Sequence, residues 1–263
     1  MENGSSTSGS ICVSVIDVGK GDCILLQAGD AAALIDTGYD KTSGNVLAFL
    51  REKGVAHLEF VIVTHYDRDH IGGMRAIGEA IAIDKVYLPN YKGADKHYRT
   101  LMDSIEQLGL ATQSVSDELS LKLGEASLTV FPSTVRFVLD AKGDEGNDND
   151  LSLVTTLVAG SDSYLFTGDL EEDGLAAHLN GAPGALGCFD VLKMPCHGKK
   201  SSLTDEFLER VQPQIVIITD SEDDPADKKV LKLLKETGAA VYRTATSGTV
   251  HVASSGAGSY TVS

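Results

Sequence analysis

Four side chains that can bind a divalent cation lie close together in the sequence: His65, Asp67, Asp69 and His70. Two imidazoles and two carboxylates packed with nothing between them would repel one another or lose hydration, and a divalent cation removes that conflict. A mixed set of nitrogen and oxygen ligands suits Zn²⁺ or Mn²⁺. The spacing therefore predicts a metal site, and a solvated acidic loop with incidental histidines is the less favoured interpretation.

The elements on either side of this motif must position it. An apolar run at residues 60–63 leads directly into the motif, and Gly72 and Gly73 follow it. The run predicts a buried strand, and residues 74–83 after the glycines predict a helix. We therefore expect the ligands on a loop at the end of a strand, where α/β proteins place functional side chains.

Two later segments repeat the pattern in which an apolar strand precedes a ligand-type side chain. Residues 164–167 lead to Asp169, and residues 189–194 lead to Cys196 and His197. A carboxylate released after an apolar strand can bridge two metal ions, whereas capping of the helix expected near residue 171 is the alternative for Asp169. His197 is the candidate for a further ligand. A Cys196 thiolate can also bind zinc, although a small buried side chain is its commoner role.

The motif at residues 64–73, THYDRDHIGG, resembles the metal-binding signature of the metallo-β-lactamase superfamily, His-x-His-x-Asp-His, with Asp in place of the second His. This variant resembles the metallohydrolase domain of ComEC-type DNA-uptake competence proteins and their free-standing relatives. The segment LFTGD at residues 165–169 matches the bridging-aspartate motif of the family, and Cys-His-Gly-Lys at residues 196–199 stands where relatives have His-His-Gly-Ser. The resemblance implies an α/β fold, a four-layer αβ/βα sandwich with the site along one edge.

The resemblance also implies roles for the ligand-type residues. The first metal site would use His65 and Asp67, the second would use Asp69, His70 and His197, Asp169 would bridge the two, and Asp36 would support the motif from behind. We assign catalysis to Asp67, Asp69 and His70. Asp69 would also orient the attacking hydroxide, and the added charge of Asp67 would favour harder ions such as Mn²⁺.

The first metal site has fewer ligands than the family pattern provides. The family's third histidine is missing, and an Asn…Ser pattern, Asn149 and Ser152, stands in its region. An Asn or Asp oxygen, or water, would complete the site; otherwise a single ion binds tightly. We therefore expect one or two ions of Zn or Mn per chain. Lys199 is a candidate to hold a phosphate oxygen, and a solvated lysine is the alternative.

Composition bounds the class of protein. We expect residues 1–10 to form a flexible Gly/Ser tail and residues 11–263 a single hydrolase domain. No segment has the run of about 18 apolar residues that spans a bilayer, so no membrane partner is expected. The 22 Lys and Arg against 38 Asp and Glu oppose an extended nucleic-acid groove. Four cysteines without paired spacing, and no signal peptide, predict a cytoplasmic protein.

These observations predict a metal-dependent hydrolase that uses a metal-bound hydroxide. The first hypothesis is a phosphodiesterase or nuclease, favoured by the resemblance and by two-metal chemistry on phosphates. The second is a hydrolase of a small ester, thioester or lactone, favoured by the acidic composition. The third is a non-catalytic binding module with a degenerate metal site. The substrate and the oligomeric state stay open.

Overall fold

The computed structural model describes residues 10–136, 146–181 and 186–263, so residues 1–9 of the predicted tail lie outside the described part. The strands are β1 (Ile11–Val15), β2 (Ile24–Ala28), β3 (Ala31–Ile35), β4 (His57–Leu58), β5 (Phe60–Ile62), β6 (Ala82–Ile83), β7 (Val86–Pro89), β8 (Thr112–Val115), β9 (Leu119–Leu123), β10 (Ala126–Phe131), β11 (Val154–Ala159), β12 (Asp162–Phe166), β13 (Val191–Lys193), β14 (Ile215–Ile218), β15 (Ala240–Arg243), β16 (Val250–Ser254) and β17 (Tyr260–Val262). The α-helices are α1 (Ser43–Glu52), α2 (Arg68–Ile71), α3 (Met74–Ala80), α4 (Lys96–Leu108), α5 (Glu172–Leu179), α6 (Thr204–Val211), α7 (Lys228–Thr237) and α8 (Thr244–Ser247).

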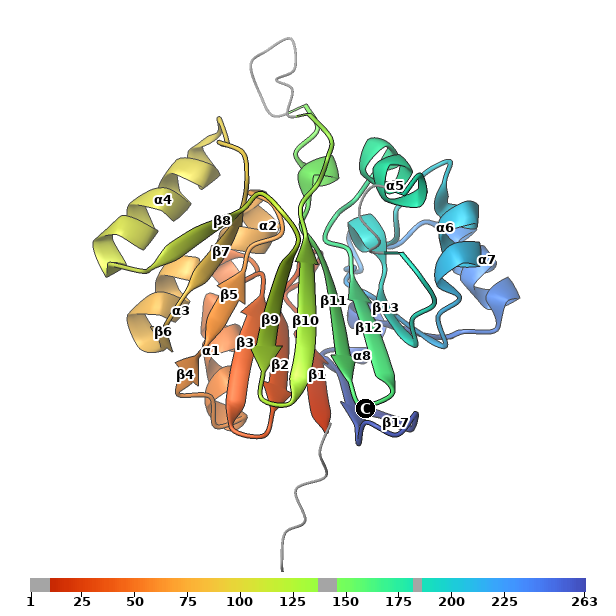
Figure 1. Cartoon of the computed structure of the whole chain (residues 1–263), viewed down its shortest axis with the longest axis horizontal. Helices are drawn as coiled ribbons and strands as arrows, with labels where there is room; N and C mark the ends of the chain where they lie inside the picture. Colours follow the sequence, from red (N-terminus) through yellow and green to blue (C-terminus); the bar gives the residue numbers. More distant parts are fainter. Residues whose placement is uncertain (1–9, 137–145, 182–185) are drawn as a thin grey trace, which may run out of the picture.

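Two mixed sheets pack face to face between layers of helices (Figure 1). One sheet has the order β17-β16-β1-β2-β3-β5-β7-β8, and the other has the order β15-β14-β13-β12-β11-β10-β9. In each sheet the antiparallel strands continue into a parallel half, β3-β5-β7-β8 in the first and β12-β13-β14-β15 in the second. Helices α1–α4 flank one sheet and α5–α7 flank the other. The predicted four-layer α/β sandwich is confirmed.

Alternating side chains on each strand build the separate layers of the core. Val13 and Val15 of β1 belong to the same buried cluster as Leu128 and Val130 of β10, and this cluster lies between the sheets. The neighbouring positions of strands such as β2 face the outer helices, because successive side chains of a strand point to opposite faces. Each fully buried aliphatic side chain contributes about 1.5–3 kcal/mol. Both faces of each sheet are therefore covered by apolar packing, and this packing holds the strand ends in place.

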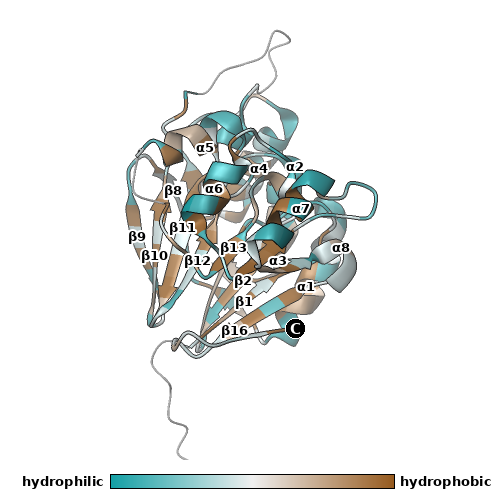
Figure 2. Cartoon of the chain, turned by 90° about the vertical axis from the view of Figure 1, so that its right-hand side faces the viewer, coloured by the Kyte–Doolittle hydropathy of each residue, from teal (hydrophilic) through white to brown (hydrophobic). Residues whose placement is uncertain are grey.

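The outer helices are amphipathic. In α7, Val230 and Leu234 are buried one turn apart, while the other face carries lysines. Figure 2 shows this contrast, with apolar strands inside and hydrophilic outer surfaces on α6 and α7. The sequence predicts a helix from about residue 96 to residue 108, and helix α4 has these bounds because its ends are signalled locally. Asp95 accepts a hydrogen bond from the Tyr98 amide at 2.7 Å, and Gly109 ends the helix in a left-handed conformation.

One local prediction differs from the structure, and two further elements were not predicted. The helix expected over residues 74–83 ends at Ala80, because Ala82 and Ile83 pair in parallel with His57 and Leu58 in a separate two-stranded sheet. Strand β8 was not predicted because its polar residues lack an apolar alternation, and it forms by pairing with β7. Helix α8 is a single turn without an apolar stripe. Among the described residues, no helix is long and apolar enough to cross a membrane.

Candidate metal centre

The motif begins where β5 ends, at the edge shared by the carboxyl ends of the parallel strands. The sequence predicted all its ligands on a loop, but Asp69 and His70 lie on the single helical turn α2. His65 and His70 are fully buried, and their ring centroids are 4.1 Å apart. The helical turn therefore brings the imidazoles of His65 and His70 together, although two carboxylate residues lie between them in the sequence.

Close backbone contacts hold the motif in place. The Thr37 amide and hydroxyl both donate to the His70 carbonyl, at 2.7 and 3.0 Å. The Asp22 amide donates to the Asp69 carbonyl at 3.1 Å. A side chain at Gly73 would place its Cβ only 2.2 Å from the Thr37 carbonyl oxygen, which explains why glycine follows the motif. The loop between β1 and β2 thus packs directly on the motif.

Asp36 organises the imidazoles from behind, as the resemblance implied. Its carboxylate accepts hydrogen bonds from the Thr64 amide at 2.8 Å and the Thr64 hydroxyl at 2.7 Å, and it lies 2.7 Å from His70 Nδ1. The Thr64 hydroxyl gives its one proton to Asp36, so it accepts from His65 Nδ1, 3.0 Å away. Both rings therefore carry their proton on Nδ1, and each Nε2 faces the site as a free ligand atom.

His197 is oriented in the same way from the other half of the fold. Its Nδ1 lies 2.9 Å from the Thr219 hydroxyl, which donates to Asp22 at 2.7 Å. Cys196 and His197 both have positive φ angles, 43° and 51°, and Gly198 continues the left-handed turn with φ 79°. Such conformations cost about 1–2 kcal/mol for each non-glycine residue. This turn directs the His197 ring back toward the motif.

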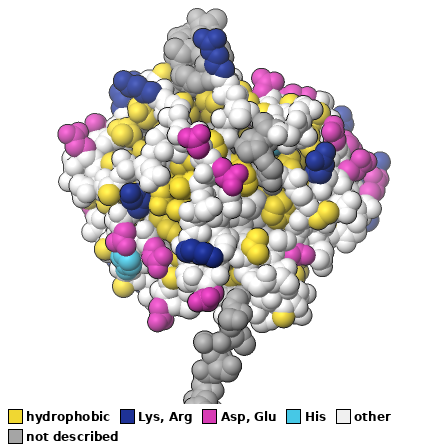
Figure 3. All heavy atoms as spheres, in the orientation of Figure 1, with side chains coloured by type: hydrophobic (Ala, Val, Ile, Leu, Met, Phe, Trp, Pro, Cys, Tyr) yellow, Lys and Arg dark blue, Asp and Glu magenta, His cyan; other side chains and the backbone are white. Residues whose placement is uncertain are grey.

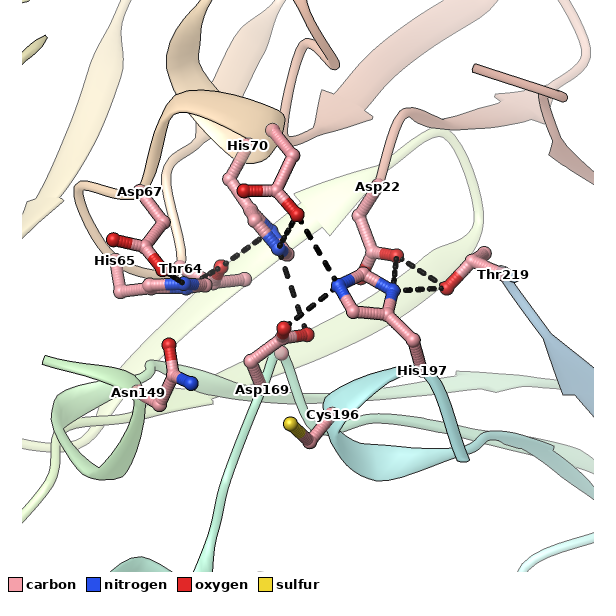
Figure 4. Close-up of polar contacts among 12 residues, drawn as sticks. Asp22, Thr64, His65, Asp67, His70, Asn149, Asp169, Cys196, His197 and Thr219 are labelled. Carbon is pink, nitrogen blue, oxygen red and sulfur yellow. Dashed lines mark hydrogen bonds and ion pairs between the residues drawn. The ribbon is translucent and has the colours of Figure 1, made fainter. Parts of the chain in front are cut away.

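Four of the predicted ligands converge in what we call the second cluster, Asp69, His70, Asp169 and His197. His197 Nε2 lies 2.7 Å from Asp169 Oδ2 and 3.4 Å from Asp69 Oδ2, and His70 Nε2 lies 3.5 Å from Asp169 Oδ1 (Figure 4). The Nε2 atoms of both rings are buried and lack a hydrogen-bond partner despite these short distances. The side chains are therefore arranged like metal ligands around one point. Their imidazole nitrogens and carboxylate oxygens fit a divalent cation.

The other two predicted ligands lie beside this group in the first cluster, His65, Asp67 and Asp148. His65 Nε2 is 3.7 Å from Asp67 Oδ2, and it too is buried without a hydrogen-bond partner. The sequence analysis did not identify Asp148. It lies in an acidic, Gly/Asn-rich segment, and within such a segment nothing in the local pattern distinguishes the one carboxylate that turns inward.

The charges of the second cluster interact strongly. Burial lowers the pKa of His70, but the carboxylates of Asp169 and Asp36 more than offset it, so the pKa lies well above its ordinary value. Burial raises the pKa of Asp169, whereas His197, Lys193 and His70 together bring it well below the ordinary value. Positive charge at this position is therefore strongly favoured, which is the electrostatic condition for binding a cation.

A buried lysine, which the sequence analysis missed, compensates part of the negative charge. Lys193 is 1% exposed at the end of β13, and its Nζ lies 2.6 Å from Asp22 and 3.2 Å from Asp169. It also donates to the Gly168 carbonyl at 2.9 Å. Burial lowers the pKa of Lys193, but the two carboxylates raise it above its ordinary value. The sequence signal that could have identified Lys193 is its position as a charged residue in an otherwise apolar strand.

The auxiliary candidates occupy different places. The Ser152 hydroxyl accepts from the Asp169 amide and lies 3.3 Å from His65 Nδ1, so it supports the ligands from behind. The Asn149 amide group donates to Glu171, and its Oδ1 is buried without a hydrogen-bond partner. Cys196 contacts the same Glu171, and burial raises the pKa of its thiol, which disfavours a thiolate ligand. Lys199 pairs with Asp224 at 2.5 Å.

A cavity of about 220 Å³ has both charged and apolar side chains on its wall, and Glu171, Glu172, Lys199 and Lys200 are the charged ones. Leu170 and Cys196, the sequence neighbours of two ligands, contribute to its wall, and Leu175, Met194 and Phe207 add apolar surface. On the face seen in Figure 3, Lys and Arg side chains lie apart from one another among Asp and Glu.

Comparisons with known proteins agree with this architecture. Residues 16–219 match the metallo-beta-lactamase superfamily. Two relatives are ComE operon protein 3 of Bacillus subtilis, 27% identical over 90% of this chain, and Recombination protein 2 of Haemophilus influenzae, 30% identical over 91%. The matches cover 32% and 28% of those proteins, so the chain spans about a third of their length.

Solved structures share the fold. The metallo-beta-lactamase fold protein YhfI from Bacillus subtilis has a TM-score of 0.62 at 15% identity, over 92% of this chain and 99% of that one. Igni18, a metallo hydrolase from Ignicoccus hospitalis, has a TM-score of 0.57 at 15% identity, over 91% and 98%. The matched residues contain the motif, Asp169 and His197. The chain belongs to the metallo-beta-lactamase superfamily and resembles the ComEC-type competence proteins within it.

Proposed function

We propose that this chain is a metal-dependent hydrolase whose substrate is a phosphodiester. The observation that carries the proposal is the convergence of three buried imidazoles, each with its Nδ1 held by a hydrogen-bonding partner and its Nε2 turned toward carboxylates. Outer partners of this kind fix the tautomer of metal-binding histidines. A set of histidines packed only for stability would not require three buried ring nitrogens that face carboxylates without a hydrogen bond at one edge of the sheets.

The residues divide the work between two adjacent sites. His65 and Asp67 would hold one cation, Zn²⁺ or Mn²⁺, and the second cluster would hold another, with Asp169 between them. When bound, such ions supply Lewis acidity and lower the pKa of a water molecule. Asp69 is the most exposed carboxylate of the second cluster, with 19% of its side chain accessible. It is therefore placed to accept a proton from an incoming water.

The resemblance to DNA-uptake competence proteins favours a nucleic-acid phosphodiester as substrate. The acidic composition opposes a long basic groove, so recognition would depend on the cations at the site. Lys20 and Lys199 both pair with Asp224, from the β1–β2 loop and from the turn after β13. These lysines are candidates for phosphate contacts, and a bound phosphate would compete with Asp224 for them.

One observation favours a second function. One wall of the cavity that Leu170 and Cys196 line is apolar, with Leu175, Met194 and Phe207, whereas the rest carries charged side chains. The apolar wall suits the acyl part of a small ester, thioester or lactone better than a phosphate.

The test compares the two reactions on one preparation. Metal content is measured after purification without chelator, and hydrolysis of bis-p-nitrophenyl phosphate and p-nitrophenyl acetate is followed with Zn²⁺, Mn²⁺ and Mg²⁺. His70→Ala and His197→Ala should lose metal and activity. His57→Ala is the matched control, because His57 is half exposed and pairs with Asp84 away from the clusters.

Hydrolysis of the phosphodiester that is lost in both variants would support the proposal and justify tests with DNA and RNA. Hydrolysis of the ester alone would favour the second function. Bound metal without hydrolysis of either substrate would instead favour a binding module.

A further inference from the structure

The first cluster contains an unexplained buried carboxylate. Asp148 is 5% exposed, and its Oδ2 has no hydrogen-bond partner. Its Oδ1 accepts a hydrogen bond from the Tyr91 hydroxyl. Among the described residues, no Lys or Arg forms an ion pair with it. A buried carboxylate oxygen without a donor is costly, and a cation bound to it would remove that cost.

The candidate partner is a cation shared with His65. The ligand atoms of His65, Asp67 and Asp148 all lie within 4.8 Å of one another. His65 Nε2 is the second buried atom without a hydrogen bond in the same place, and the proton of the ring is kept on Nδ1 by Thr64. One imidazole nitrogen and two carboxylate oxygens that face a common point form a three-ligand site.

We propose that Asp148 is the third protein ligand of the first metal site, with His65 and Asp67, and that Tyr91 holds its other oxygen. This proposal rests on the metal-binding part of the proposed function and is independent of the substrate. It assigns to this chain a complete two-metal centre where the motif alone left the first site short of ligands. Two carboxylates on one divalent cation balance its charge and favour Mn²⁺ over an imidazole-rich zinc site.

The other nearby oxygens fit the position less well. The Ser152 hydroxyl lies on the Nδ1 side of His65, behind the ring, and accepts from the Asp169 amide. Asn149 has an unpartnered Oδ1, but a neutral amide oxygen supplies no charge, and its amide group is held by Glu171. Asn149 is therefore the matched comparison for Asp148.

The experiment counts bound Mn²⁺ by titration and electron paramagnetic resonance, without any substrate. The unsubstituted chain should bind two ions and show the signal of a coupled Mn²⁺ pair. Asp148→Asn should lose one ion, or bind it about 10–100-fold more weakly, and lose the coupled signal. Tyr91→Phe should weaken the same ion less. Asp148→His should keep two ions and shift the preference toward Zn²⁺. This variant tests the role of position 148 even if Asp148→Asn does not fold.

The outcomes separate this proposal from the proposed function. Equal number and affinity of Mn²⁺ in Asp148→Asn and in the unsubstituted chain would overturn the role of Asp148 and leave the hydrolase proposal standing. A loss confined to Asn149→Ala would also overturn it, in favour of Asn149. An unsubstituted chain that binds neither Mn²⁺ nor Zn²⁺ would reject both proposals.

Discussion

Asp22 accepts a hydrogen bond from the Thr219 hydroxyl at 2.7 Å, although the two residues are 197 positions apart. The same hydroxyl lies 2.9 Å from His197 Nδ1. This carboxylate–hydroxyl–imidazole arrangement repeats the one that orients His65 in the motif. The two halves of the fold thus hold their histidines by the same device, and each hydroxyl sets which ring nitrogen is free.

Removing one of these hydroxyls should weaken metal binding. Thr219→Val keeps the shape of the side chain but leaves His197 without its partner, so metal affinity should fall roughly 10–100-fold. Calorimetric titration with Zn²⁺ or Mn²⁺ measures this. Thr219→Ser keeps the hydroxyl and should bind like the unsubstituted chain. Unchanged affinity in the Val variant would show that the relay does not orient the ligand.

Lys193 should be important for stability. Lys193→Met removes the buried cation that pairs with both Asp22 and Asp169, which should cost about 3–5 kcal/mol of unfolding free energy. Urea denaturation in the presence of chelator measures the loss. Lys232→Met, which breaks an exposed pair with Glu236, should change stability by less than about 1 kcal/mol. Equal effects of the two substitutions would contradict the assignment.

Gly21 should be intolerant of a side chain. A Cβ there would lie 2.7 Å from the Asp69 carbonyl oxygen and 2.9 Å from the Asp69 Cβ, so Gly21→Ala must displace the motif. We expect a loss of about 1–3 kcal/mol of stability together with weaker metal binding. Thermal unfolding with and without Mn²⁺ reports both effects. Gly44→Ala is the control, because no atom lies within 4 Å of its added Cβ.

His178 should make stability depend on pH. Burial lowers its pKa to about 4, and neither ring nitrogen has a hydrogen-bond partner. The unfolded chain binds this proton near pH 6.5, so stability is complete above that value and falls as pH drops toward 4, by roughly 1.4 kcal/mol per pH unit. His178→Leu should remove this contribution in chelator-treated protein. If the stability of His178→Leu depended on pH as that of the unsubstituted chain does, this role of His178 would be contradicted. His57→Ala is the control, because it removes an exposed histidine.

Elements with strong local signals could be predicted from the sequence alone. Helix α4 was predicted with its observed bounds because an N-cap, an apolar stripe and a terminal glycine agree. The apolar run at residues 31–35, which ends at Asp36, likewise predicts a strand, and β3 has these bounds. Strand β8 could not be predicted, because its residues acquire strand structure only by pairing with β7.

For the site, the sequence determined which strands end in ligand-type residues, and the resemblance ordered them. That Asp22, Lys193 and Asp148 belong to the same centre could be seen only in the folded chain. Lys193 ends the parallel strand β13, whereas Asp22 lies before β2 and Asp148 before β11, and the packing of the two sheets brings these strand ends to one edge. Contacts across that edge depend on the packing of the two sheets, and no local spacing in the sequence records them.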